Sequence, residues 1–168
     1  MIVDTREPVE ICWLLEGAGF EFDRVALDSG DYLWVARGGT SVAVERKTVL
    51  DLLHSLSDRQ ANKRPRIINQ ILRMREAYDE VILLIEGHLV SNSHGKVVAE
   101  GRTSTWSWEA LDNFLLTVQR AGVAVVRTPK NGLPTRLASL MTYYEKPVHL
   151  LPPLPRSSPP PELLEEAA

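Results

Sequence analysis

Two stretches of strand length are apolar throughout, and they constrain the fold of this chain more than any other feature of its sequence. They are "VILLI" at residues 81–85 and "VAVV" at residues 123–126. A strand that is apolar on both faces has to be covered on both faces, which is typical of parallel strands between layers of helices. Long helix-like patterns flank both runs. We therefore predict an α/β fold in which a mixed sheet has helices on both faces.

The first third of the chain consists mainly of short strand-like runs. Residues 20–27, 31–36 and 41–47 are rich in apolar and β-branched side chains, and the turns between them are short and contain glycine. Connections of this kind predict an antiparallel meander. A further short strand is predicted at residues 1–4, and residues 91–105 are predicted to form an exposed loop.

Helices are predicted where apolar residues recur every three to four positions. In the stretch 65–78 the residues Ile67, Ile71, Met74 and Tyr78 form one stripe, and Pro65 suits a first helical turn. The other predicted helices cover residues 9–19, 49–56, 108–122 and 133–146.

The composition is typical of one globular domain. Of the 168 residues, 44% are hydrophobic and 24% are charged, which suffices for a continuous core. The longest apolar run has the length of a strand, so no membrane span is expected, and the N-terminus lacks the pattern of a secretory signal.

Cys12 is the single cysteine, which excludes an internal disulfide and suits a reducing compartment. We therefore expect an intracellular, cytoplasmic protein.

The last part of the chain has a different composition. Residues 147–161 contain seven prolines, and a short acidic segment follows them. This predicts a domain at residues 1–146 and an extended tail at residues 147–168. The tail is expected to be disordered, and a docking segment for a partner protein is the alternative.

One stretch is strongly basic although the net charge of the chain is −3. Residues 59–75 contain six Lys or Arg residues and no Asp or Glu. Such a stretch is compatible with phosphate binding on one face of the molecule, and a solvated helix face is the other interpretation. The candidate DNA contacts in it are Arg59, Lys63, Arg64 and Arg66.

The strand predicted at residues 41–47 ends in three charged residues. Because side chains alternate along a strand, Glu45 and Lys47 lie on one face and Arg46 on the other. Charges at the end of an interior strand are costly unless they are paired. A divalent metal ion would pair with the carboxylate, and a phosphate would pair with the lysine. Arg46 is expected to pair with a buried acid such as Glu7.

A metal site needs further oxygen ligands, and two acidic residues at predicted strand ends can supply them. They are Asp4, the last residue of the first predicted strand, and Asp31, the first residue of the strand predicted at 31–36. In a meander Asp31 and Glu45 converge at one end, and Asp4 can complete a set of three carboxylates beside Lys47. That set suits metal-assisted hydrolysis of a phosphodiester.

These residues also form an ordered pattern that resembles a known family. Gly30-Asp31, then Glu45-Arg46-Lys47, then three residues and Asp51, is similar to the signature of the XPF family of structure-specific DNA endonucleases. The stretches "VDTRE", "GDY", "VERK", "DLLHSL" and "ILLIEG" agree with its nuclease domain, and the resemblance covers residues 2–146. Family members usually continue into tandem helix-hairpin-helix modules, where this chain has its Pro-rich stretch.

The resemblance implies a restriction-endonuclease-like fold, dependence on Mg²⁺ or Mn²⁺, and cleavage of branched DNA near duplex–single-strand junctions in repair, recombination or replication. It also implies a homodimer. By the same resemblance, Asp31 and Glu45 ligate the metal with help from Asp4, and Lys47 acts at the reacting phosphate. Support of the site or contact with DNA is implied for the residues Arg6, Glu7, Arg46 and Asp51.

Several alternatives remain open at this point. Asp51 fits a capping box that begins at Thr48 as well as it fits a site role. Glu86, at the end of an apolar strand, is expected to join a salt bridge or a helix cap. A four-way junction resolvase on the same fold is not distinguished by the sequence. A DNA-binding subunit without activity is the other alternative, although such subunits typically lose the acids that this chain retains.

Overall fold

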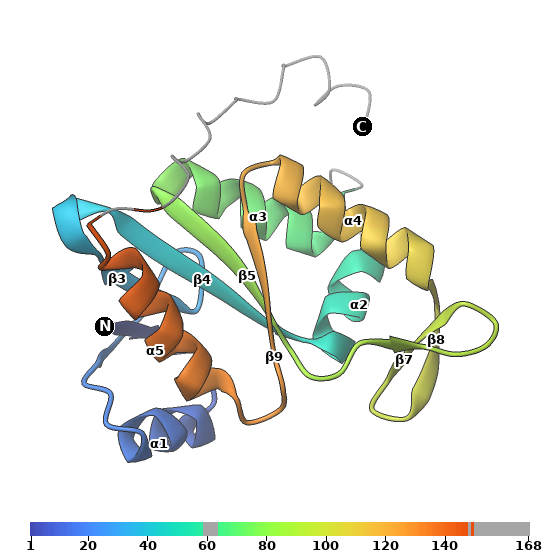
Figure 1. The fold of residues 1–168 in the computed structure, drawn as a ribbon, viewed down its shortest axis with the longest axis horizontal. Coiled ribbons are helices and arrows are strands. Elements are labelled where there is room, and N and C mark those ends of the chain that lie inside the picture. Colours follow the sequence, from blue (N-terminus) through green and yellow to red (C-terminus); the bar gives the residue numbers. More distant parts are fainter. Residues whose placement is uncertain (59–63, 148, 150–168) are drawn as a thin grey trace.

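The structure is a computed structural model that describes residues 1–58, 64–147 and 149. Strands and helices alternate along the described chain (Figure 1). In chain order the elements are β1 (Ile2–Asp4), α1 (Val9–Gly17), β2 (Asp23–Val25), β3 (Tyr32–Val35), the short 3-10 helix η1 (Arg37–Gly39), β4 (Ser41–Thr48), α2 (Val49–Ser57), α3 (Arg66–Ala77), β5 (Glu80–Glu86), β6 (Val90–Ser91), β7 (Lys96–Ala99), β8 (Arg102–Ser107), α4 (Trp108–Arg120), β9 (Ala124–Thr128) and α5 (Leu133–Tyr144).

A six-stranded mixed sheet forms the centre of the fold, with the strand order β2-β1-β3-β4-β5-β9. The strands β4, β5 and β9 run parallel to one another, and β3 is antiparallel to both of its neighbours. Helices α2, α3 and α4 cover one face, and α1 and α5 cover the other (Figure 1). This arrangement confirms the predicted α/β class with a mixed sheet between helices.

The core has two halves because β4 and β5 are buried on both faces. Alternate residues of these strands enter different halves, as period-two geometry requires. On the side of α2, α3 and α4 they are Ala43, Val81, Leu83 and Ile85, and on the side of α1 and α5 they are Val42, Val44, Ile82 and Leu84. The two apolar faces of the central strands therefore have the structural role that the sequence predicted for them.

The predicted meander is correct in one part and wrong in another. The segments 31–36 and 41–47 do form an antiparallel pair, in which Tyr32 lies opposite Val44. The segment 20–27 does not join them, because β2 pairs in parallel with β1, which lies between β2 and β3. The residues of β2 are all exposed, whereas Val3 of β1 is fully buried. Burial of β1 thus decides which strand neighbours β3.

The loop predicted at residues 91–105 is instead a small sheet in the order β6-β7-β8. Val97 and Ala99 are buried against the side of the core that contains α2 and α4. The turn between β7 and β8 has positive φ angles at Glu100 (49°) and Gly101 (75°). Glutamate rarely adopts this conformation, so the residues of the turn did not indicate a hairpin.

Within the described ranges, no helix is long and apolar enough to cross a membrane. The predicted tail from residue 147 onward lies outside the described residues except for residues 147 and 149. The third predicted helix does form as α3, and Ile67, Ile71 and Met74 are the residues that it buries. The end of β4 and the beginning of β3 lie beside α3, and this is where the charged side chains meet.

Candidate active site

Strand β4 places its consecutive charged side chains on opposite faces of the sheet. Glu45 is 2% exposed, and its Oε1 lies 2.5 Å from Lys47 Nζ. Arg46 turns to the other face, where its guanidinium contacts two further carboxylates. The alternation predicted from the sequence is therefore present, with an acid and a lysine side by side on the face of α2 and α3.

Asp31 lies beside this pair because the backbone of β4 holds it there. Its N–H donates to the carbonyl of Val44 at 2.8 Å, and its Oδ2 accepts the N–H of Arg46 at 2.7 Å. Gly30, directly before it, has a φ of +84°, and a Cβ at this position would lie 3.1 Å from Met74 Cε. Glycine is therefore favoured at this turn by its backbone conformation, and a Cβ would require the end of the Met74 side chain to shift by a few tenths of an ångström.

The ionised form of Asp31 is disfavoured in the protein without a metal ion. Burial, together with the negative charges of Glu45 and Glu7, raises the pKa of Asp31 to about 8. The backbone N–H of Arg46 and the charge of Lys47 act in the opposite direction without cancelling these effects. A carboxylate held in this way favours a proton or another cation as its partner.

One oxygen of each of the two carboxylates has its partners within the protein. Glu45 Oε1 accepts hydrogen bonds from Lys47 Nζ and, at 2.8 Å, from Gln70 Nε2. Asp31 Oδ2 accepts the bond from Arg46. Among the described residues, no hydrogen bond ends on Glu45 Oε2 or Asp31 Oδ1, so each carboxylate keeps one oxygen for a ligand.

Asp4 occupies the neighbouring position on β1, but its oxygens are engaged. Oδ1 accepts from the backbone N–H and the Nε of Arg6 at 2.7 and 2.6 Å, and Oδ2 accepts from Leu27 N–H at 2.7 Å and Arg6 Nη2 at 3.0 Å. Burial acts to raise the pKa of Asp4, but the hydrogen bonds from Arg6 and Leu27 outweigh it, so that this pKa is lowered. Asp4 thus ties Arg6 and residue 27 to the sheet, and its predicted role as a metal ligand stays a prediction.

The donor set fits one hard divalent cation. Mg²⁺ is usually held by one or two carboxylates and keeps several water ligands. Asp31 and Glu45 supply two carboxylate groups with one oxygen each unpartnered, and Lys47 lies alongside. Across the part of the chain that the structure describes, no group of three or more His, Cys, Asp or Glu side chains is arranged to hold a metal ion. The geometry therefore suits a cation that completes its coordination with water or phosphate oxygens.

A family model described as the ERCC4 domain matches residues 3–152, which is most of the chain. The chain belongs to the ERCC4 domain family. The match confirms the predicted resemblance to the XPF nucleases. A comparison with curated proteins finds no match.

Two solved structures support the assignment to the ERCC4 domain. XPF from Aeropyrum pernix is 26% identical over 87% of this chain and 65% of its own, with a TM-score of 0.61. XPF from Aeropyrum pernix in complex with DNA is 27% identical over 90% of this chain and 66% of its own, with a TM-score of 0.64. This chain thus spans slightly less than two thirds of the length of either structure.

On the other face of the sheet, Arg46 braces the site of this ERCC4 domain. Its Nη2 lies 2.6 Å from Glu86 Oε2, and its Nη1 lies 3.5 Å from Glu7. The hydroxyl of Tyr32 donates to Glu7, and the N–H of Asn131 donates to Glu86 at 3.1 Å. Burial raises the pKa of Glu7, although Tyr32 and Arg46 act to lower it. The pairings expected for Arg46 and Glu86 are both present.

Asp51 stands apart from the other residues of the family pattern. It is exposed at the start of α2, its N–H donates to Thr48 Oγ1 at 3.1 Å, and Thr48 Oγ1 donates to its Oδ2 at 2.7 Å. The first of these bonds caps the helix as predicted, whereas the carboxylate of Asp51 accepts from the hydroxyl of Thr48 and not from the backbone N–H that a complete capping box uses. The hydrogen bonds of Asp51 thus account for its position without any contact to Asp31 or Glu45.

The predicted DNA contacts divide into three cases. Arg6 is anchored on Asp4, but 66% of its side chain is exposed beside the site. Arg66 begins α3, where it contacts Asp58 and Ser55, and Arg64 is partly buried. Arg59 and Lys63 lie outside the described residues. The three described arginines therefore keep their predicted role as an expectation.

Sequence reasoning missed Gln70, which contacts Glu45 directly. The residue lies three positions after Ile67 and four before Met74, so it belongs to the stripe of α3 that faces the core. A polar residue within an apolar stripe was the available signal. Its partner, 25 residues earlier in the chain, is defined only by the folded structure.

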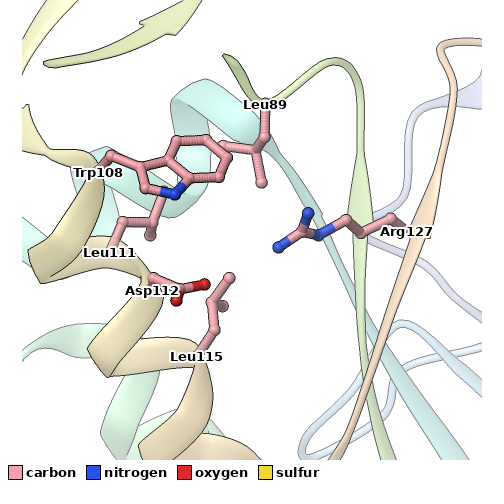
Figure 2. A pocket seen from close by; sticks show the side chains of 6 residues that line it. All are labelled: Leu89, Trp108, Leu111, Asp112, Leu115 and Arg127. Carbon is pink, nitrogen blue, oxygen red and sulfur yellow. The ribbon is translucent and has the colours of Figure 1, made fainter. Parts of the chain in front are cut away.

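Two hollows on the surface lie away from Asp31, Glu45 and Lys47. Figure 2 shows one between α4 and β9, lined by Leu89, Trp108, Leu111, Asp112, Leu115 and Arg127, and it leaves no room for a water molecule. A more open hollow of about 270 Å³ lies at the ends of β5 and β9, lined by Gly87, His88, Leu89, Arg127, Thr128 and Pro129. Neither hollow contains Asp31, Glu45 or Lys47, which lie where β3 begins and β4 ends, in the middle of the sheet.

Proposed function

We propose that this chain is a metal-dependent, structure-specific DNA endonuclease that hydrolyses phosphodiester bonds near duplex–single-strand junctions. The observation that supports this most is the arrangement of Asp31, Glu45 and Lys47 where β3 begins and β4 ends in the sheet of an ERCC4 domain. The similarity to an XPF structure solved with DNA supports DNA as the substrate.

In this proposal each residue has a separate task. Asp31 Oδ1 and Glu45 Oε2 hold Mg²⁺ or Mn²⁺, while the other oxygen of each carboxylate stays bound to the protein. When bound, the metal ion supplies Lewis-acid polarisation of the phosphate and lowers the pKa of a coordinated water. Lys47, held 2.5 Å from Glu45, offsets negative charge that develops on the phosphate. Arg46 keeps the end of β4 in place from the opposite face.

The DNA is proposed to approach across the exposed side chain of Arg6 and the start of α3. Arg6 is fixed by Asp4, and Arg66 is partly exposed at the first residue of α3. Both positions suit phosphate contacts, which supply affinity but no sequence preference. An intracellular location is part of the same proposal, because the substrate is DNA.

Self-association is also proposed. Leu116 on α4 and Tyr143 on α5 are about half exposed, at 53% and 47%, although both are large apolar residues. The two helices cover opposite faces of the sheet, so each of them separately is proposed as a contact for a second copy of the chain. Sedimentation of the purified chain at micromolar concentration tests this, and a monomer throughout would contradict it.

A cleavage panel tests the main proposal. Labelled flap, fork and four-way-junction DNA is incubated with the chain in Mg²⁺, in Mn²⁺ and in EDTA, and the products are mapped. We expect cutting of at least one branched substrate that depends on the metal. Symmetric paired nicks in the four-way junction would favour a resolvase, and no cutting of any substrate would refute an endonuclease.

Matched variants then test the assignment of residues. Glu45→Gln and Lys47→Ala are each expected to lower cleavage by roughly a hundredfold or more, the scale of removing one group that stabilises charge in a transition state. DNA binding should change little. The controls are Glu16→Gln, on the exposed end of α1, and Lys146→Ala, after α5, which should both cut at the normal rate.

A further inference from the structure

Gln70 is held against the candidate metal site by one half of its amide group. Its Nε2 donates to Glu45 Oε1 at 2.8 Å, the same oxygen that Lys47 contacts. Glu45 is almost fully buried, so this bond replaces solvation that the carboxylate lost on folding. Two donors on one oxygen turn the carboxylate so that its other oxygen stays free.

The second half of the same amide has no partner among the residues that the structure describes. Gln70 Oε1 is buried, and no described residue donates a hydrogen bond to it. A flipped amide does not relieve this, because the flip would place an oxygen against Glu45 Oε1, which already accepts a hydrogen bond from Lys47. The amide orientation is therefore determined by Glu45, and a buried acceptor is left next to the site. Such groups are rare in folded proteins, and each calls for a specific explanation.

The packing of α3 makes the position of this acceptor rigid. Gln70 lies one turn before Met74, and a Cβ at Gly30 would lie only 3.1 Å from Met74 Cε. The same helix therefore packs on the turn before Asp31 and donates to Glu45. Because Ile67 and Ile71 on either side of Gln70 are buried, the helix cannot rotate to give Oε1 to solvent.

We propose that Gln70 is a positioning residue of this site: it orients Glu45 through Nε2 and accepts, through Oε1, a hydrogen bond from a water molecule at the Asp31–Glu45 site. The inference rests on the proposed function, since that water belongs to a hydrated divalent cation or to the attacking nucleophile. Partners of this kind around metal ligands typically change metal affinity or activity by about 10- to 100-fold when they are removed.

The test variant is Gln70→Met, which keeps the length of the side chain and a good helix former but removes both hydrogen bonds. The matched control is Gln119→Met, the same change at an exposed position of α4. Mn²⁺ binding is measured by calorimetry without DNA, and cleavage kinetics are measured with the best branched substrate of the unmodified chain.

We expect Gln70→Met to bind Mn²⁺ about tenfold or more weakly and to lower kcat by at least about tenfold. The KM for DNA should stay within about twofold, because Gln70 touches no DNA in this proposal. Gln119→Met should leave all three quantities unchanged. If Gln70→Met matches Gln119→Met in Mn²⁺ affinity and kcat while the unmodified chain cuts DNA, the inference is wrong and the proposed function stands.

A measurement on the unmodified chain does not depend on how the variant folds. Mg²⁺ is titrated into ¹⁵N-labelled protein, and the side-chain amide of Gln70 is followed together with the backbone N–H of Arg46, which donates to Asp31. We expect both signals to shift along one binding curve. A shift of Arg46 without one of Gln70 would overturn the inference alone, and no response of either would overturn the proposed metal site with it.

Discussion

Replacing Asp31 with asparagine is expected to stabilise the metal-free protein. Burial and two neighbouring carboxylates raise the pKa of Asp31 from 3.8 to about 8. A difference of about four pKa units corresponds to an upper limit of about 5–6 kcal/mol, because each unit is worth about 1.4 kcal/mol. Water entry and relaxation around the charge reduce this, and we expect an increase in the free energy of unfolding of about 1–3 kcal/mol at pH 8. The asparagine side chain keeps an oxygen that accepts the N–H of Arg46, so the fold loses no hydrogen bond.

The pH dependence has a definite sign. The folded state keeps its proton on Asp31 up to a pH near 8, whereas the unfolded chain loses it near pH 4, so unfolding releases a proton between these values. The wild type therefore loses stability relative to Asp31→Asn as the pH rises from about 4, and the difference is complete above the folded pKa of about 8. Below about pH 4 the two proteins should be equally stable.

Urea unfolding in EDTA between pH 4 and 9 measures this difference, with Asp112→Asn on the exposed surface of α4 as the control. For a chain of this size, about 1–3 kcal/mol corresponds to a rise in Tm of roughly 2–12 °C. Saturating Mg²⁺ should stabilise the wild type and leave Asp31→Asn unchanged. A difference that does not vary with pH, or an asparagine variant that is less stable at pH 8, would refute the electrostatic account of this site.

Three further changes test the surrounding structure, and a fourth tests Asp51. Arg46→Ala leaves two buried carboxylates without their cation and should lower the free energy of unfolding by about 3–5 kcal/mol in urea titrations; a loss below about 1 kcal/mol would contradict the bracing role. Thr48→Ala removes the cap of α2 and should cost about 1 kcal/mol in the same titrations. Gly30→Ala should cost about 1–2 kcal/mol from its φ of +84° alone, and a crystal structure of the variant should show Met74 displaced. Asp51→Asn should leave the cleavage rate within about twofold of the normal rate, and a loss of a hundredfold or more would instead place Asp51 among the catalytic groups.

The charged end of β4 could be predicted in detail because it depends on one local rule. Side chains alternate along any strand, so Glu45 and Lys47 had to share a face and Arg46 had to leave it. The cap of α2 by Thr48 is equally local, since all its atoms lie within four residues. The pairing of β3 with β4 followed from a short turn that contains glycine.

Features that depend on distant packing could not be predicted in the same way. The position of β1 between β2 and β3 reflects the burial of Val3, which competes with the simpler neighbour order of a meander. The engagement of both Asp4 oxygens depends on the N–H of Leu27, which belongs to a distant part of the chain. The small sheet at β6–β8 contains a turn whose residues do not match the usual hairpin types.

The class of the fold, and the acid and lysine that share a face of β4, follow from the order of the amino acids, because periodicity along a strand or helix is a property of neighbouring residues. The oxygens that remain free and the side chain that orients Glu45 depend on packing between distant segments. Gln70 reaches Glu45 because Met74 packs against Gly30 and because Ile67 and Ile71 bury the same face of α3. Contacts of this kind depend on how a helix packs on a sheet, and no pattern of neighbouring residues specifies that packing.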